Sequence, residues 1–248
     1  MTLFEIDHVN FGYGRDRLVL DDVSLSVARG RNLGIVGESG SGKTTLLRLL
    51  LGLNRPSAGS IRFDGAPLDT TDRSFMRSYR RSVQAVFQDP YSSLDPRQKV
   101  ASIIAEPLQS LRIPGSVDDA VLQALLAVGL SADALERYPH QFSGGQRQRI
   151  AIARAIVARP QLLLADEAVS ALDLSTRIRI VELLKTLSQS MTLLLVSHDL
   201  GVVAALCEDI VILERGRIVE NGNTRQILNN PQHSYTRRLI DSVPRMPA

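Results

Sequence analysis

The spacing of apolar residues divides the chain into segments of two kinds. Near the N-terminus, apolar side chains occupy alternate positions over 9–13 and again over 23–27, with glycines and charged residues between the runs. This pattern predicts an antiparallel pair of strands with one buried face. Further strands are expected at 33–36, 61–63, 83–87, 162–167, 192–196 and 210–213.

The middle of the chain carries only helical patterns. Between residues 98 and 158 apolar residues recur at helical spacing, as at Ile103, Ile104 and Leu108, and no strand pattern separates the helices. A β/α chain interrupted by a long all-helical segment predicts an inserted subdomain. We therefore expect an α/β protein with an N-terminal antiparallel β subdomain and an inserted α-helical subdomain.

A glycine-rich segment joins the strand at 33–36 to the helix that follows it. It reads GESGSGKT over residues 37–44. The three glycines let the backbone wrap with its N–H groups turned inward, and the start of the helix adds the positive end of its dipole. The motif in this strand, loop and helix context predicts a phosphate-binding loop. Lys43 would reach the β- and γ-phosphates, and the hydroxyl of Thr44 would take one position on Mg²⁺.

Polar residues stand at the carboxyl ends of three predicted strands: Gln88, the pair Asp166 and Glu167, and His198. Open α/β sheets bind their ligands at this edge. Because neighbouring strand residues face opposite ways, the two carboxylates are expected to have different tasks. Asp166 is suited to hold Mg²⁺ through the water molecules bound to the metal. Glu167 is suited to polarise the water that attacks the γ-phosphate.

Two further features allow more than one interpretation. Ser143, at the start of a strong helical pattern, is a good N-cap, and Gly144 and Gly145 leave backbone N–H groups open. These residues have the features of a second anion site, although ordinary helix capping explains them as well. Tyr13 is equally suited to stacking on a purine ring and to filling a core.

Composition and charge exclude several classes of protein. The 248 residues carry a formal net charge of only +3, so no dense basic field marks a nucleic-acid-binding protein. The arginines between 73 and 81 have helical spacing and are interpreted as a solvated face. One cysteine, Cys207, excludes an internal disulfide and fits a reducing compartment. No basic leader and no long apolar run is found, so a membrane role is expected to come through a partner.

Together these motifs resemble the nucleotide-binding subunits of ATP-binding cassette (ABC) transporters, over essentially the whole chain. The resemblance depends on features in family order and spacing, namely the phosphate loop, Gln88, the FSGGQ segment, the strand ending at Glu167, residues 170–173 and His198. Within the family, 86–97 and 231–239 are similar to the oligopeptide, dipeptide and nickel uptake branch.

The resemblance implies a P-loop NTPase (RecA-like) fold and a single ATP-binding domain over 1–248. Residues 1–90 and 160–248 would form the RecA-like core with the antiparallel β subdomain. Residues 91–159 would form the helical subdomain that carries the FSGGQ motif.

The resemblance also implies roles for the motif residues. Those for ATP binding are Tyr13, Gly37, Glu38, Ser39, Gly40, Ser41, Gly42, Lys43, Thr44 and Thr45. Those that would complete the ATP site of a facing subunit are Ser143, Gly144, Gly145 and Gln146, and the dimer interface loop would be Ser170, Ala171, Leu172 and Asp173. Mg²⁺ would be held by Thr44, Gln88 and Asp166. The implied catalytic residues are Glu167, His198, Gln88 and Lys43, with His198 holding the γ-phosphate and the attacking water.

Members of this family use ATP and Mg²⁺, so we expect an ATPase that powers an importer of a peptide, nickel, a metallophore or a related solute. The implied partners are two transmembrane permeases, a second ATP-binding subunit that is identical or different, and an extracytoplasmic solute-binding protein, with no nucleic acid. The expected location is the cytoplasmic face of the inner membrane, as a peripheral protein. The alternative is an ABC protein of DNA repair or chromosome maintenance. Such proteins insert coiled coils or zinc modules before the FSGGQ-type segment, and this sequence has neither heptads nor cysteine pairs there.

Overall fold

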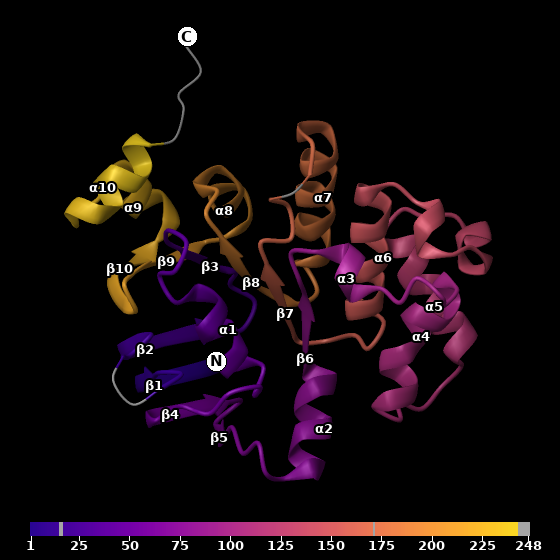
Figure 1. Ribbon diagram of the computed structural model, residues 1–248, viewed down its shortest axis with the longest axis horizontal. Helices are drawn as coiled ribbons and strands as arrows, with labels where there is room; N and C mark the ends of the chain where they lie inside the picture. The colour runs from indigo at the N-terminus through magenta and orange to yellow at the C-terminus, as the bar shows by residue number, and fades with distance from the viewer. Residues whose placement is uncertain (15–16, 171, 243–248) are drawn as a thin grey trace. The chain divides into compact units, whose positions relative to one another are not determined.

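The computed structural model describes residues 1–14, 17–170 and 172–242. They form two compact units (Figure 1). The first unit comprises Met1–Thr70 and Thr192–Ala248, and the second unit comprises Thr71–Met191. The subdomain boundaries expected from the sequence, at residues 90 and 160, stay a prediction.

An antiparallel sheet opens the first unit. Its strands are β1 (Thr2–Phe11), β2 (Leu20–Ala28), β4 (Ala58–Phe63) and β5 (Ala66–Pro67), in the order β2-β1-β4-β5. Ile6 of β1 is opposite Leu25 of β2 and Ile61 of β4, and all three side chains are buried. The predicted antiparallel pair is therefore confirmed: one face of the sheet is apolar, and the register places apolar residues side by side on it. The first predicted run extended too far, because β1 ends at Phe11 and Tyr13 lies beyond it.

The first unit also contains strands in the order β10-β9-β3-β8. These are β3 (Leu33–Val36), β8 (Thr192–Ser197), β9 (Asp209–Glu214) and β10 (Arg217–Asn223), with β3 parallel to β8 and β9, and β9 and β10 forming an antiparallel hairpin. The helices of this unit are α1 (Lys43–Leu50), α8 (Leu200–Leu206), α9 (Thr224–Asn229) and α10 (Ser234–Asp241). β3 and β8 are buried at every residue, as parallel strands with continuous apolar sequences require.

The second unit contains two parallel strands and most of the helices. The strands are β6 (Val83–Val86) and β7 (Leu162–Asp166). The helices are α2 (Arg73–Ser82), α3 (Pro90–Ser93), α4 (Val100–Ser110), α5 (Val117–Ala127), α6 (Gly144–Ile156) and α7 (Leu174–Leu187), with 3-10 turns η1 (Ala132–Glu136) and η2 (Pro139–Gln141). In Figure 1, α4, α5 and α6 lie together, and they pack through apolar faces that include Ile104, Leu125 and Ile150. The helical segment predicted for 98–158 is confirmed.

Two local details differ from the sequence-based expectation. β6 ends at Val86, so Phe87 lies outside the strand and is 41% exposed. β7 ends at Asp166, so Glu167 is not a strand residue and has φ of 45°. The rule that neighbouring strand residues face opposite ways therefore does not set the direction of the Glu167 side chain.

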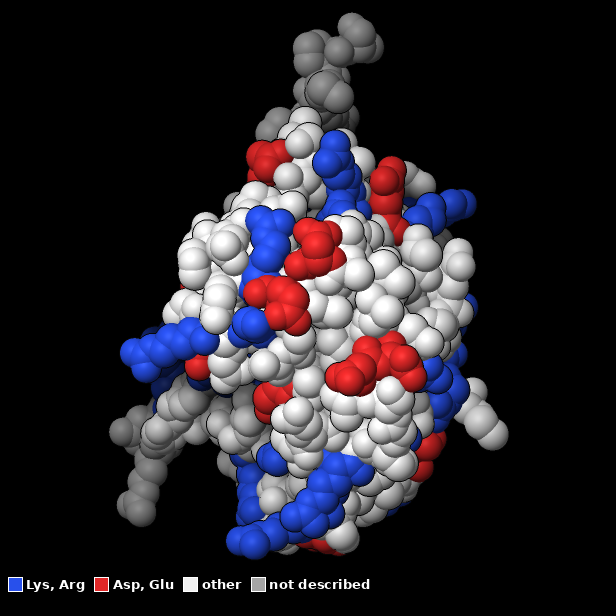
Figure 2. All heavy atoms as spheres, turned by 90° about the vertical axis from the view of Figure 1, so that its right-hand side faces the viewer, with Lys and Arg blue, Asp and Glu red and all other residues white. Residues whose placement is uncertain are grey.

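Charged side chains are distributed without a broad field of one sign on the face that Figure 2 draws, where basic and acidic groups are interspersed. The helix α2 bears out the expected solvated arginine face, because Arg73, Arg77, Arg80 and Arg81 are all exposed. Within the described ranges, no helix has both the length and the apolar character needed to cross a membrane.

Candidate functional site

The phosphate loop lies in the first unit, between the end of β3 and the start of α1. Gly40 and Gly42 have positive φ values of 79° and 110°, a region that side chains other than glycine rarely adopt. A Cβ atom at Gly37 would overlap the main-chain oxygen of Leu213. The glycines are therefore required by the geometry of the loop.

Lys43 and Ser41 give the interior of this loop its polar character. Lys43 Nζ donates hydrogen bonds to the main-chain oxygens of Gly37 (2.7 Å) and Glu38 (2.8 Å), so its charge is held over the loop. Ser41 Oγ is buried and has no hydrogen-bond partner among the described residues. Because buried hydroxyls are normally paired, an unpaired one beside a lysine fits a loop that receives phosphate oxygens.

Tyr13 lies after β1 and contacts the first turns of α1. Its hydroxyl is 3.4 Å from Thr45 Oγ1 and accepts from Arg48 Nη1 at 3.3 Å. The hydrogen bond with Thr45 is the main cause that lowers the pKa of Tyr13. The residue is 61% exposed, which excludes the core interpretation and leaves the ring open to a planar ligand.

His198 belongs to the same unit as the phosphate loop. Val36 of β3 pairs with Ser197 of β8, and the residues that follow them are Gly37 and His198. Since the two strands are parallel, His198 and the start of the loop leave the same edge of the sheet. His198 is exposed, and Asp199 caps the following helix by accepting from the backbone N–H groups of residues 201 and 202.

Gln88 and Glu167 come together in the second unit. Val86 and Ala165 are opposite each other in β6 and β7, so the segments that follow these strands begin at one edge. Gln88 Nε2 donates to Ser170 Oγ (3.2 Å), and Ser170 Oγ donates to the main-chain oxygen of Glu167 (3.0 Å). Ser170 thus links the two residues, and Asp166 immediately precedes Glu167.

The FSGGQ segment forms the N-terminus of α6 in the second unit. Ser143 Oγ accepts from the backbone N–H of Gln146 (3.4 Å), and Gln146 Oε1 accepts from the backbone N–H of Ser143 (3.0 Å). This capping box bears out the helix-cap interpretation of Ser143. Gly144 has open space where a side chain would begin. The N–H groups of the first helical turn therefore remain accessible beside the cap.

Two comparisons decide the family. Residues 20–170 match the family model described as ABC transporter, and 219–248 match the model described as oligopeptide/dipeptide transporter, C-terminal region. The chain belongs to the ABC transporter family. It is an ABC-type ATPase with the P-loop fold expected from its motifs.

Relatives and solved structures of ABC proteins match this ATPase over nearly its whole length. A putative peptide import ATP-binding protein of Brucella ovis is 46% identical over 230 residues, which is 91% of this chain and 73% of that protein. The dipeptide transport ATP-binding protein DppF of Escherichia coli is 44% identical over 241 residues, covering 94% and 72%. The dimeric ATP-binding cassette MJ0796 in a post-hydrolysis state bound to ADP and phosphate is similar in structure, with a TM-score of 0.79, 29% identity and coverage of 90% and 99%. The DNA-repair alternative is not favoured.

The segment 170–173, expected to be an interface loop, is described in part, because Ala171 lies outside the described residues. Asp173 caps α7 by accepting from the backbone N–H of Thr176 (3.0 Å) and the hydroxyl of Ser175 (2.7 Å). The bond from Thr176 is the leading cause that lowers the pKa of Asp173 to about 2. The carboxylate therefore stays ionised at neutral pH and fixes the start of the helix.

Sequence reasoning missed Thr176 and Tyr235, which support the motifs of this ATPase, and it missed one role of Ser170. Ser170 was expected in an interface loop, not as the link between Gln88 and Glu167. Thr176 packs against Gly145, and Tyr235 contacts the phosphate loop. Tyr235 falls in the 231–239 segment, whose resemblance to the uptake branch was the only signal that could have drawn attention to it.

Proposed function

We propose that this ABC ATPase is the ATP-hydrolysing subunit of a peptide importer. The support is the match of 219–248 to the oligopeptide/dipeptide transporter region and the peptide and dipeptide transport names of the relatives. Nickel and metallophores remain within the expected cargo range. The proposed partners are two permeases, a second ATP-binding subunit and an extracytoplasmic binding protein, and the proposed location is the cytoplasmic face of the membrane.

The residues of the phosphate loop fit a nucleotide with Mg²⁺. The buried Ser41 hydroxyl and the Lys43 ammonium provide two polar groups for phosphate oxygens. Thr44, Gln88 and Asp166 would hold the metal. Phosphate oxygens of the nucleotide would complete this donor set. Mg²⁺, when bound, neutralises part of the phosphate charge.

Asp166, Glu167 and His198 would have different roles in ATP hydrolysis. Glu167 would accept the proton of the attacking water, and Ser170 holds the main chain of Glu167 in place. His198, at the edge where the phosphate loop begins, would orient the γ-phosphate and that water. Tyr13 would stack on the adenine ring, and Asp166 would act on the metal.

The observation that carries the proposal is that one chain contains a glycine-rich loop with the buried Ser41 hydroxyl and Lys43, and a glycine pair at the N-terminus of α6. Ser143, Gly144, Gly145 and Gln146 would complete the ATP site of a facing subunit. The loop of residues 170–173 would lie at the interface between the two subunits. ATP would then favour the closed pair, because its phosphates contact both subunits only in that state.

ATP turnover by the complete transporter, reconstituted with its permeases and binding protein, tests this function. Glu167→Gln is expected to lower turnover about 10²- to 10⁴-fold while nucleotide still binds, since it removes the general base. Ser143→Arg is expected to lower turnover strongly while the isolated subunit still binds ATP. The matched control is Ser116→Arg, because the Ser116 side chain also caps a helix, α5, by accepting from the backbone N–H of Asp119.

Three outcomes would contradict the proposal. Near-normal turnover by Glu167→Gln would show that Glu167 is not the general base. Equal turnover by the Ser143→Arg and Ser116→Arg transporters would show that Ser143 does not complete an ATP site. An active wild-type transporter that takes up no peptide would show that peptides are not the cargo.

A further inference from the structure

The C-terminal helix α10 is connected directly to the phosphate loop. The backbone N–H of Glu38 donates a hydrogen bond of 2.9 Å to the hydroxyl of Tyr235. Tyr235 is only 3% exposed, so its ring is held by packing and its hydroxyl has a fixed direction. The two residues are far apart in the sequence and both belong to the first unit.

The start of α10 is itself anchored to the sheet. The Glu220 carboxylate of β10 accepts from the backbone N–H groups of Gln232 (2.9 Å) and His233 (3.1 Å). His233 Nδ1 then accepts from the backbone N–H of Tyr235 (3.2 Å). A continuous chain of hydrogen bonds therefore runs from β10 through the beginning of α10 to the phosphate loop.

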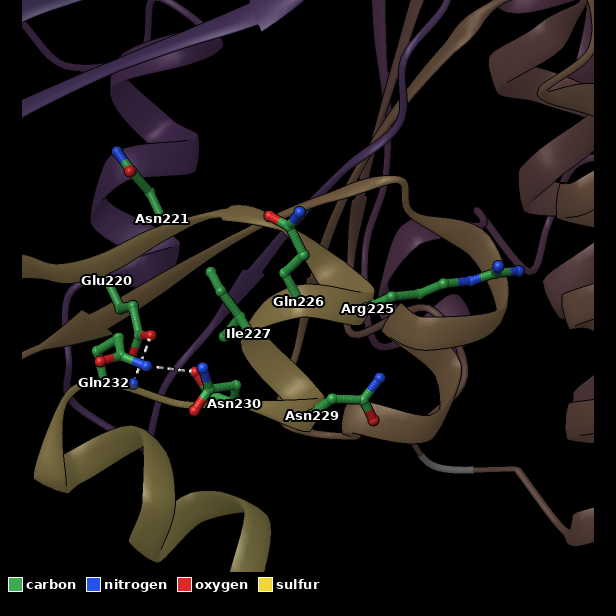
Figure 3. Close-up of a pocket in the computed structure, with 8 residues that line it drawn as sticks. All are labelled: Glu220, Asn221, Arg225, Gln226, Ile227, Asn229, Asn230 and Gln232. Carbon is green, nitrogen blue, oxygen red and sulfur yellow. Dashed lines mark hydrogen bonds between the residues drawn. The ribbon is translucent and has the colours of Figure 1, made fainter.

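Glu220 and Gln232 lie at the wall of an open cavity of about 670 Å³, which Figure 3 shows between residues of β10, α9 and the segment after α9. The cavity borders this anchor on the solvent side. A conservative substitution of Glu220 therefore changes its hydrogen bonds without disturbing close apolar packing.

The main chain of Glu38 is held from two sides. Its N–H donates to Tyr235, and its carbonyl accepts from Lys43 Nζ at 2.8 Å. A lysine that turns toward phosphate gives up carbonyl contacts, whereas the hydrogen bond to Tyr235 uses neither Lys43 nor the inward-facing glycines. Tyr235 is thus able to hold the start of the loop whether Lys43 contacts the carbonyl groups or a bound phosphate.

We propose that Tyr235 is a positioning residue for nucleotide binding, which preorganises the phosphate loop through Glu38. The inference depends on the proposed function, because it assigns the C-terminal segment a part in holding ATP. Removing the hydroxyl leaves the Glu38 N–H without its partner, so binding must first order the loop. The net value of one neutral hydrogen bond corresponds to a loss of about two- to tenfold in affinity.

The test is a titration of the purified full chain with Mg²⁺ and a fluorescent ATP analogue. Tyr235→Phe keeps the ring and is expected to raise Kd about two- to tenfold, with turnover by the transporter at saturating ATP unchanged. The matched control is Tyr79→Phe, which removes the same atom from a tyrosine that is 2% exposed in the second unit. The control is expected to bind the analogue as wild type does, and the melting temperatures of the two variants without nucleotide are expected to agree.

A second variant tests the chain of hydrogen bonds. Glu220→Gln converts one carboxylate oxygen into a group that cannot accept from Gln232 or His233, so it is expected to raise Kd in the same direction. Its effect should be smaller in the Tyr235→Phe background, because both variants act through one connection.

Unchanged affinity in Tyr235→Phe, or an equal loss in Tyr79→Phe, would overturn the inference. A lower turnover at saturating ATP in Tyr235→Phe would overturn it as well, because positioning for binding affects affinity alone. Lys43→Ala separates this failure from that of the proposed function. If Lys43→Ala binds the analogue as wild type does, the assignment of the nucleotide site to the phosphate loop is wrong. If Lys43→Ala loses binding while Tyr235→Phe does not, only the role proposed for Tyr235 is wrong.

Discussion

Gly145 is the position in the FSGGQ segment where a small substitution has a calculable effect. A Cβ atom there would lie well inside 3.0 Å of Thr176 Cγ2 on α7, closer than real Cβ atoms approach other atoms. Ordinary contact between carbon atoms is about 3.5–4.0 Å, so one side chain must move by roughly 1 Å. Overpacking of this kind costs about 1–3 kcal/mol, and the better helix propensity of alanine returns about 0.5–1 kcal/mol.

Gly145→Ala is therefore expected to destabilise the protein by about 1–2 kcal/mol, or roughly 2–8 °C in melting temperature for a chain of this size. Gly144→Ala is the matched control, because nothing lies within 4 Å of the added atom. Thr176→Ser removes the methyl group that the new Cβ would meet and keeps the hydroxyl. The double variant Gly145→Ala with Thr176→Ser should recover most of the lost stability.

The assay is thermal unfolding followed by circular dichroism, with hydrogen exchange of the α6 and α7 amides to locate the effect. If Gly145→Ala and Gly144→Ala melt at the same temperature, the close packing of α6 on α7 is refuted. If Thr176→Ser fails to restore Gly145→Ala, the loss does not come from the contact with Thr176.

Two further predictions concern other parts of the chain. Ser170→Ala should lower turnover at saturating ATP by roughly 3- to 30-fold, because it removes hydrogen bonds to both Gln88 and Glu167, whereas Ser170→Thr keeps the hydroxyl and should retain most activity. The hydrogen bond that His8 Nδ1 donates to the Asp22 carboxylate raises the pKa of His8, so this pair stabilises the fold below the unfolded pKa of His8 and loses that effect as pH rises through the raised value. Asp22→Asn should move the His8 titration, followed by NMR, to lower pH; an unchanged titration would contradict the pairing.

The sequence was sufficient for features determined by nearby residues. Alternating apolar positions predicted β1 and β2, and the glycines and lysine at 37–44 predicted the phosphate loop, because backbone conformation and burial both follow from short-range patterns there. The capping box of Ser143 and Gln146 is equally local, since its residues lie three apart.

The sequence was insufficient for contacts between distant segments. Tyr235 and Glu38 are separated by 197 positions, and Gln88 and Ser170 by 82, so no periodicity connects them. The backbone of Glu167 shows the same limit in a different way. Its apolar neighbours predicted a strand, but β7 ends at Asp166 and Glu167 has a φ of 45°, so the alternation of the strand does not set the direction of its side chain.

The contacts made by Tyr235, Thr176 and Ser170 have a common physical reason. Loops that handle phosphate need glycines and open N–H groups, and both features leave a loop with little side-chain packing of its own. The two glycine-containing segments here are each supported by a residue outside the motifs, since Tyr235 holds Glu38 and Thr176 packs against Gly145. Ser170, which belongs to the segment 170–173, holds the main chain of Glu167. Affinity and rate should therefore respond to substitutions that leave every motif residue in place. A chain that carries the glycine-containing motifs but lacks Tyr235, Thr176 and Ser170 should bind nucleotide more weakly and turn it over more slowly.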